Sequence, residues 1–335
     1  MNRNWLSVEP EGLYIRPAAV YVDPITPVEK AIVTHAHADH ARPGHMRVYA
    51  TPETLAIMAC RFGARFSEER VAVDLGDTLE LPNGVAMRLS PAGHILGSAQ
   101  VTLTYNNEVA TISGDYKRAY DPTCQPFEVQ KSDIFITEAT FALPVFTQPP
   151  IEDELERLLQ SLRDFPHRCH LLGAYALGKC QRLMSVLRQL GYEETIYLHG
   201  AQIKLVELYE QFGVDLGRWR KVSEVEDKAS LAGKLVIAPP SALADKWSRR
   251  FPDVMTCLAS GWMQIRARAK QRRVELPLTI SDHADWPQLV ETIRQVDPAQ
   301  LWVTHGREDA LVHHAKQQGI DAIALNLLGY DEEAD

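Results

Sequence analysis

Residues 34–40 read THAHADH, so three histidines and an aspartate lie within six consecutive positions. They follow a short apolar run that is typical of a β-strand. In an extended chain alternate side chains point the same way, so His35, His37 and Asp39 would share one side, with His40 beside them where the chain turns. Imidazole and carboxylate ligands suit zinc, manganese or iron, and this density suits two ions better than one. The segment therefore predicts a metal centre at the end of a strand.

Three further candidate ligands stand where other apolar runs end. They are His94 in PAGHILGS, Asp115 in SGDYKR and His305 in VTHGR. Each alone is more typical of a turn residue or a capping group than of a metal ligand. Together with residues 34–40 they would supply two more imidazoles and a carboxylate that can bridge two ions.

The first third of the chain reads as short strands separated by turns, with one helix near residues 51–60. Strands are predicted at 20–23, 31–34, 85–90, 101–105, 109–113 and 134–137, with a hairpin turn at Asn106 and Asn107. A proline-rich segment, ALPVFTQPP, then reads as a linker.

Beyond this linker, predicted helices and strands alternate, which indicates βαβ units and a parallel sheet. The helices are expected at 151–165, 179–190 and 201–212, and the strands at 169–173, 195–198 and 235–238. Residues 278–328 return to strand, helix, strand, helix and strand, with the helices near 287–295 and 309–318. We therefore expect an α/β module, 148–275, inserted between two parts of a sheet-rich domain, 1–147 and 276–328, with an acidic tail at 329–335.

The charge balance has to be weighed against any nucleic-acid partner. The formal net charge is −9, whereas phosphate binding is driven largely by Lys and Arg. The predicted tail holds four of the acidic residues, and carboxylates that bind divalent cations present positive charge to a substrate once they are loaded. The position of the charges on the molecule therefore matters more for nucleic-acid binding than the net charge does.

Cysteine usage and hydropathy point to a cytoplasmic protein. The five cysteines are scattered and never spaced as CxxC, which argues against a disulfide framework or a thiolate zinc site. The first residues lack the apolar core of a secretory signal, and no apolar stretch is long enough for a membrane span.

The order HxHxDH, then His, Asp and His, resembles the metallo-β-lactamase superfamily. The resemblance implies a four-layer αββα sandwich that binds two divalent ions, zinc by default with manganese as the alternative. It assigns one ion to His35, His37 and His94, the other to Asp39, His40 and His305, and the bridging position to Asp115. Asp23 in YVDP matches a family position that supports the ligand loop without binding metal.

Two more motifs resemble the β-CASP nucleases, the branch that cleaves DNA or RNA. Glu138 in ITEATF is similar to motif A, His283 in ISDHADW to motif B, and His305 would double as motif C. In that branch an inserted domain lies between motifs A and B, where the alternating segment is found here. The resemblance implies that His283 is the general acid and Glu138 its orienting partner, and it counts Asp39 among the catalytic residues.

The insert offers candidate substrate contacts. GAYALGKCQRL resembles a β-CASP segment in which a glycine opens a helix, so Lys179 or Arg182 could receive a phosphate. The run GWMQIRARAKQRR contains Arg266, Arg268 and Lys270 and no carboxylate, so it could follow a nucleic-acid backbone or be a solvated face. Tyr175 and Trp262 could stack on bases, but a core role is equally compatible.

Nearly the whole chain is similar to the bacterial DNA ligase-associated exonucleases, through THAHADHARPGH, GWMQIRARAKQRR and LTISDHADWP. This resemblance implies a DNA-repair exonuclease, directed at 5′ ends, that works with an ATP-dependent DNA ligase and a helicase. An RNA-processing β-CASP ribonuclease stays open, because a motif C histidine is more typical of RNA-processing members. Motif C also departs from the usual His-Gly-Glu, since Arg307 follows Gly306 and the acid, Glu308, is displaced by one.

Two other functions have less support from the sequence. A small-molecule esterase or lactonase of the same fold would not need Glu138, His283 or a basic insert. A non-catalytic scaffold subunit would be expected to have lost metal ligands, whereas this chain keeps all seven.

Overall fold

The computed structural model describes residues 5–251 and 253–325, so the predicted acidic tail lies outside the described residues. The chain divides into two compact units: residues up to Thr147 with those from His283 onward, and the intervening segment Gln148–Asp282. The first division coincides with the expected boundary. The second falls seven residues beyond the expected 275, because strand β17 (Leu276–Leu278) pairs with the sheet of the insert.

The first sheet of the larger unit has the order β1-β2-β3-β4-β5-β6, antiparallel up to β3 and parallel beyond it. Its strands are β1 (Leu6–Glu9), β2 (Gly12–Ile15), β3 (Val20–Val22), β4 (Lys30–Ile32), β5 (Arg47–Ala50) and β6 (Glu69–Ala72). Only β3 and β4 are predicted from the sequence. The others are four-residue strands, which are too short to establish an alternating pattern.

The second sheet has the order β19-β18-β11-β10-β9-β8-β7. Its strands are β7 (Thr78–Leu81), β8 (Val85–Pro91), β9 (Ala99–Tyr105), β10 (Glu108–Ile112), β11 (Ile134–Ala139), β18 (Gln300–Gly306) and β19 (Asp321–Ala324). The hairpin prediction is confirmed: Tyr105 pairs with Glu108, and Asn106 and Asn107 both have positive φ, as a type I′ turn requires.

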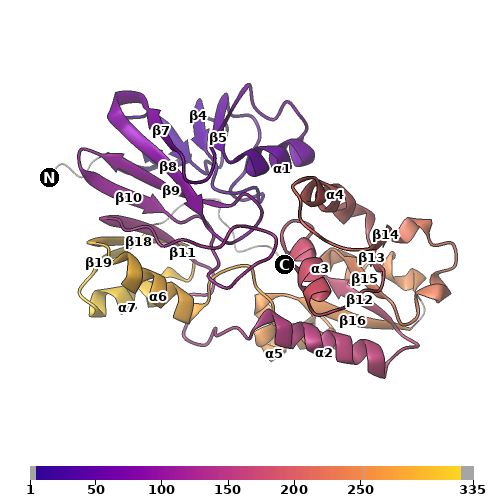
Figure 1. Ribbon diagram of the computed structural model, residues 1–335. Helices are drawn as coiled ribbons and strands as arrows, with labels where there is room; N and C mark the ends of the chain where they lie inside the picture. The colour runs from indigo at the N-terminus through magenta and orange to yellow at the C-terminus, as the bar shows by residue number, and fades with distance from the viewer. Residues whose placement is uncertain (1–4, 252, 326–335) are drawn as a thin grey trace. The chain divides into compact units, whose positions relative to one another are not determined.

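The two sheets pack face to face over one hydrophobic core, which contains Ile15 and Ile32 from the first sheet and Met87 and Val101 from the second. On the far side of the second sheet, α6 (Trp286–Val296) and α7 (Glu308–Gln317) bury Leu289 and neighbouring apolar residues against β11 and β18. Helix α1 (Pro52–Phe62) lies beside β5 and β6 (Figure 1). The predicted fold class, a mixed α/β sandwich of the metallo-β-lactamase type, is confirmed.

The smaller unit is built on an all-parallel sheet, which confirms the predicted βαβ pattern. Its strand order is β14-β13-β15-β12-β16-β17. The strands are β12 (Cys169–Gly173), β13 (Ile196–Leu198), β14 (Trp219–Lys221), β15 (Leu235–Ala238), β16 (Val254–Ala259) and β17; the helices are α2 (Ile151–Asp164), α3 (Lys179–Gln189), α4 (Ile203–Gln211) and α5 (Arg266–Gln271). The strands β14 and β16 and the short helix α5 are not predicted from the sequence.

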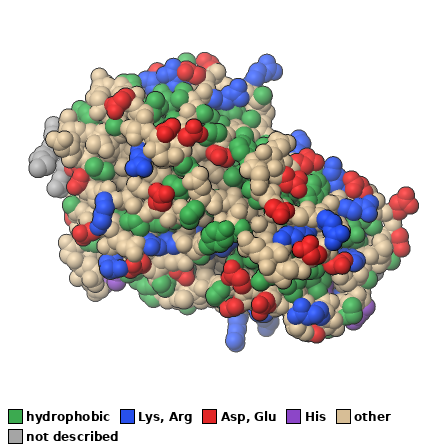
Figure 2. Space-filling model, viewed as in Figure 1, with side chains coloured by type: hydrophobic (Ala, Val, Ile, Leu, Met, Phe, Trp, Pro, Cys, Tyr) green, Lys and Arg blue, Asp and Glu red, His purple; other side chains and the backbone are tan. Residues whose placement is uncertain are grey.

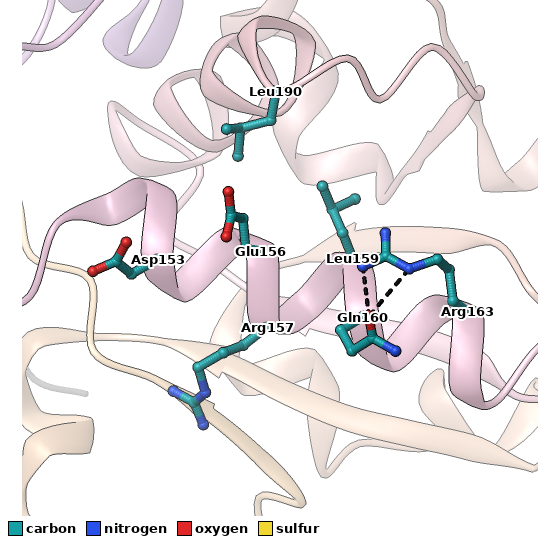
Figure 3. A pocket seen from close by; sticks show the side chains of 7 residues that line it. All are labelled: Asp153, Glu156, Arg157, Leu159, Gln160, Arg163 and Leu190. Carbon is teal, nitrogen blue, oxygen red and sulfur yellow. Dashed lines mark hydrogen bonds between the residues drawn. The ribbon is translucent and has the colours of Figure 1, made fainter.

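A cavity of about 610 Å³ opens beside α2 in the smaller unit (Figure 3). Arg163 on its wall donates to the side-chain oxygen of Gln160. The lining residues are Asp153, Glu156, Arg157, Leu159, Gln160, Arg163 and Leu190. They include no histidine or cysteine, unlike the candidate ligands of residues 34–40.

Figure 2 shows Lys and Arg interspersed with Asp and Glu over the face in view, so the excess of acidic residues does not form one patch there. Among the described residues, no helix is long and apolar enough to cross a membrane.

Candidate metal centre

The ligand loop begins directly after β4 and brings its imidazoles to those of distant segments. His35 Nε2 lies 3.2 Å from His37 Nδ1, which in turn lies 3.0 Å from His94 Nε2. His94 comes from the turn after β8, so two strands of different sheets end at this point. Ligand atoms around a tetrahedral zinc ion, each about 2.0–2.1 Å from the metal, lie roughly 3.3 Å apart. The spacing of these nitrogens therefore fits a zinc-sized cation.

Asp115, in the turn after β10, lies at the middle of the candidate site. Its Oδ2 is 3.4 Å from His35 Nε2, 3.4 Å from His40 Nε2 and 3.7 Å from His94 Nε2. Three groups of potential ligands have been found among the described residues, and Asp115 belongs to all of them: His35, His37, His94 and Asp115; His40, Asp115 and His305; Asp115, Glu138 and His283. One carboxylate is thus common to all three groups of potential ligands.

Asp39 is the least enclosed of the seven expected ligands. Its Oδ2 lies 3.6 Å from His40 Nε2, and 27% of its side chain is exposed. It stands outside the three groups, so its place in the ligand set rests on the resemblance.

Asp23 is placed to orient the ligand loop. Its Oδ1 accepts from the Thr34 amide at 2.8 Å, and its Oδ2 accepts from the Thr34 hydroxyl at 2.6 Å and contacts His40 Nδ1 at 2.8 Å. The Thr34 hydroxyl also lies 3.0 Å from His35 Nδ1. Because the Nδ1 atoms of His35 and His40 are engaged in this way, their Nε2 atoms face Asp115, which is how supporting contacts fix a ligand tautomer.

Two of these residues adopt a backbone conformation that non-glycine residues rarely take. Asp23 has φ 45° and His305 has φ 58°. Such conformations are uncommon outside glycine and gather at functional sites. Gly306 follows with φ 127°, and a Cβ there would lie 2.4 Å from the Ala139 carbonyl oxygen, so the VTHGR segment requires glycine at this position.

Burial and charge set the protonation of the cluster. Burial lowers the pKa of His35 well below its ordinary value and that of His305 to about 3, so both are neutral at pH 7. For Asp115, burial acts to raise the pKa, but His40 and the other histidines outweigh it and hold the pKa well below the usual range. Neutral imidazoles around an ionised carboxylate are the protonation state that metal binding needs.

His40 behaves differently. Its burial acts to lower the pKa, but Asp115 and Asp39 outweigh this and raise the pKa well above the ordinary value. The site therefore stabilises a positive charge at His40, between two carboxylates. A bound cation would take the place of that proton, so the residues present fit a metal ion.

A second pair of groups adjoins Asp115. His283 Nδ1 lies 2.9 Å from Glu138 Oε2 and 3.9 Å from Asp115 Oδ2. Glu138 Oε1 also accepts from the Tyr116 amide at 2.7 Å, and Lys117 Nζ contacts the His283 carbonyl oxygen at 3.4 Å. Burial raises the pKa of Glu138, an effect that the nearby His283 opposes. The pair is thus a buried, oriented carboxylate–imidazole couple.

The structure places Lys179 and Arg182 differently from the expectation that they receive phosphate. Both side chains are nearly fully buried on α3. Lys179 Nζ lies 3.3 Å from Asp282 Oδ2, and Arg182 Nη1 lies 3.4 Å from Asp282 Oδ1 and donates to the Ser281 carbonyl at 2.8 Å. We therefore assign these cations to Asp282, the residue before His283, because a charge that is already paired and buried is poorly placed to bind substrate.

Replacing Asp282 with alanine should destabilise the smaller unit. Removing one partner of a buried ion pair typically costs about 3–5 kcal/mol, which lowers the Tm of a unit this size by roughly 10 °C or more. Thermal unfolding followed by circular dichroism measures the change, with the exposed Asp164→Ala as the control. Equal melting temperatures for the two variants would show that Asp282 does not stabilise the unit.

The expected contacts on α5 remain solvent-facing. Arg266 and Lys270 are exposed, and Arg268 lies over the Trp262 ring, with its Cζ 4.0 Å from the ring centroid. Trp262 itself is buried, which favours the core role for this residue over base stacking. The backbone-tracking role of Arg266, Arg268 and Lys270 stays a prediction.

Comparison with known proteins finds similarity to metallo-hydrolases and nucleases. Residues 274–324 match the family described as "Zn-dependent metallo-hydrolase RNA specificity domain". A protein of Opitutus terrae named "Probable DNA ligase" is 28% identical over 94% of this chain and 30% of its own length. A "Transcription termination factor FttA" of Thermococcus kodakarensis is 26% identical over 52% of this chain and 33% of its own, and "Endoribonuclease ysh1" of Aspergillus fumigatus is 32% identical over 36% and 14%.

These matches, together with the His/Asp cluster, support a metallo-hydrolase of the β-CASP metallo-β-lactamase type. The chain spans a third or less of the length of each of these relatives. A crystal structure of a protein of unknown function from Enterococcus faecalis aligns with a TM-score of 0.56 at 14% identity, covering 82% of this chain and 74% of that one, which shows a shared fold.

Several residues of this β-CASP centre are not predicted from the sequence. Thr34 stands inside THAHADH without being a ligand, Lys117 holds the backbone of His283, and Arg61 from α1 donates to the ligand loop. The only sequence signal for Thr34 and Lys117 is that each lies within two residues of an expected ligand. No sequence signal indicates Arg61, because 21 residues separate it from His40.

Proposed function

We propose that this chain is a two-metal nuclease that hydrolyses phosphodiester bonds, and that its substrate is DNA. The observation that carries the proposal is the Glu138–His283 couple beside Asp115. Hydrolysis of a phosphodiester expels an alkoxide, a poor leaving group that has to be protonated as it departs. Lactone or thioester hydrolysis does not require such a group, so the couple favours a nuclease.

The ligand set fits two divalent ions, with zinc preferred and manganese as the alternative. One ion would be held by His35, His37 and His94. The other would be held by His40, His305 and Asp39, and Asp115 would contact both ions. Bound there, such ions lower the pKa of water to supply hydroxide at neutral pH and neutralise charge on phosphoryl oxygens.

Other residues of the chain would orient the general acid and hold the ligand loop. Glu138 Oε2 accepts from His283 Nδ1 and so fixes the ring, while Nε2 of the same ring would carry the proton that passes to the leaving oxygen. The contact from Lys117 to the His283 carbonyl oxygen holds the backbone at this position. Asp23 and Thr34 keep the ligand loop in place from behind.

The choice of DNA is supported by the match to the Opitutus terrae protein. That match covers nearly all of this chain but under a third of the named ligase, so a region resembling this chain is joined there to a much longer remainder. We infer a DNA-repair exonuclease, directed at 5′ ends, that acts in the cytoplasm with an ATP-dependent DNA ligase and a helicase. In the insert, Arg266, Arg268 and Lys270 would follow the DNA backbone.

Ribonuclease activity is the second candidate. The description of the matching family refers to RNA specificity, and one similar protein is named an endoribonuclease. The residues of the site would hydrolyse a phosphodiester of either sugar by the same chemistry, so the ligand set is compatible with RNA as well.

We expect the purified protein, supplied with Zn²⁺ or Mn²⁺, to degrade single-stranded DNA and to spare RNA of the same sequence. The measurement uses matched strands labelled at the 5′ or the 3′ end, with Asp115→Ala as the inactive control. The order in which the two labels are released gives the polarity and separates exonuclease from endonuclease cutting. Cleavage of RNA alone would move the assignment to RNA processing, and cleavage of neither would contradict the nuclease proposal.

A further inference from the structure

One cation of the larger unit reaches the ligand loop from outside it. Arg61 lies in the last turn of α1, a helix that begins at Pro52 behind its cap Thr51. Its Nη1 donates to the carbonyl oxygen of Ala36, the residue between the expected ligands His35 and His37. This hydrogen bond holds the guanidinium at the edge of the candidate metal centre.

Residues 37–39 of the ligand loop, which follow Ala36, are accessible to solvent. His35 and His40 are buried, whereas His37 and Asp39 are partly accessible and Ala38 is exposed. Arg61 is exposed as well. Arg61 therefore contacts the ligand loop next to its accessible residues, 37–39.

The guanidinium has unused binding capacity. An arginine carries five N–H donors, and the hydrogen bond to Ala36 uses one of them. Among the described residues, no carboxylate lies within ion-pair distance of Arg61. Burial lowers the pKa of Arg61, and the negative charge of Asp39 opposes this effect.

We propose that Arg61 binds a phosphate of the nucleic-acid strand next to the scissile bond. The planar fork of arginine suits bidentate contact with phosphate oxygens, and fixing it through Ala36 reduces the rotamer freedom that is lost on binding. This inference rests on the nuclease function proposed above and adds a substrate contact from the larger unit.

The alternative is that Arg61 only supports the ligand loop and does not contact the substrate. A set of variants separates these two roles. Arg61→Gln keeps an N–H donor for the Ala36 carbonyl but removes the charge, Arg61→Lys keeps the charge but removes the fork, and Arg61→Ala removes both. Arg65→Ala is the matched control, because Arg65 is also exposed and lies four residues further along the chain.

Steady-state kinetics on a labelled single strand at several salt concentrations, with metal content measured for each variant, tests the proposal. We expect Arg61→Gln and Arg61→Ala to bind full metal and to raise KM about 10- to 100-fold with a smaller change in kcat. The slope of log affinity against log salt should shrink by about 0.7, the value for one single-strand phosphate contact, while Arg61→Lys keeps the slope.

Three outcomes would overturn the inference. Loss of metal in Arg61→Ala, together with wild-type kinetics in Arg61→Gln, would show that Arg61 only supports the ligand loop. A fall in kcat without a change in KM or salt slope would exclude a phosphate contact. Kinetics equal to those of Arg65→Ala would exclude any role in binding. An inactive wild-type protein would instead contradict the nuclease proposal, so the two failures are distinguishable.

Discussion

Asp115→Ala should abolish cleavage and remove bound metal, the largest effect that we expect from any single substitution. Asp115 is the residue shared by all three groups of potential ligands, and its Oδ2 lies within 3.4–3.7 Å of His35, His40 and His94. Its loss leaves neutral imidazoles without the anion that offsets the cations. Metal ions contribute several kcal/mol to such reactions, so a loss on the order of 10⁴-fold in kcat is expected.

The measurement pairs activity with metal content by elemental analysis. Asp77→Ala is a suitable control, because Asp77 is an exposed aspartate of the same unit. Asp115→Asn is the stricter variant, since the amide keeps the shape and loses the charge. If Asp115→Ala retained two equivalents of metal, the bridging assignment would be wrong.

The sequence predicts the candidate site well because ligands cluster at the ends of strands. His94, Asp115 and His305 each follow an apolar run, and the structure brings them to residues 34–40 from separate strands. A strand-end position and a residue type capable of binding metal are both local properties. For this reason a one-dimensional pattern is enough to select these positions, even though up to 270 residues separate them.

Partners of charged residues were not predictable in the same way. Lys179 and Arg182 carry the pattern of a phosphate-binding helix start, and nothing local in that pattern indicates that Asp282, about 100 residues away, occupies them. Arg61 shows the reverse case, since only the fold brings α1 to Ala36. Hydrophobic periodicity likewise misses β5 and β6, because these four-residue strands are too short to establish a period.

His283→Ala should retain metal and lose about 10²–10⁴-fold in kcat, the range that one general acid contributes. His283 Nδ1 lies 3.9 Å from Asp115 Oδ2, farther than any of the three expected ligand nitrogens that face this oxygen, and its close partner is Glu138 at 2.9 Å. The imidazole is thus oriented by a carboxylate that is not among the seven expected ligands. Glu138→Gln, which keeps the shape of the side chain but not its charge, should show part of the same loss.

The leaving group provides the decisive control for this role. A nitrophenyl phosphodiester expels an anion that needs no proton, so His283→Ala should cleave it nearly as fast as the wild type while its activity on a nucleic-acid strand falls. Asp115→Ala should fail on both substrates, because the metal supports attack in each. Equal losses on both substrates for His283→Ala, or equal losses of metal in the two variants, would show that His283 supports the metal centre and does not donate the proton. The comparison therefore separates the residue that expels the leaving group from the residues that activate water, a distinction that distances alone do not provide.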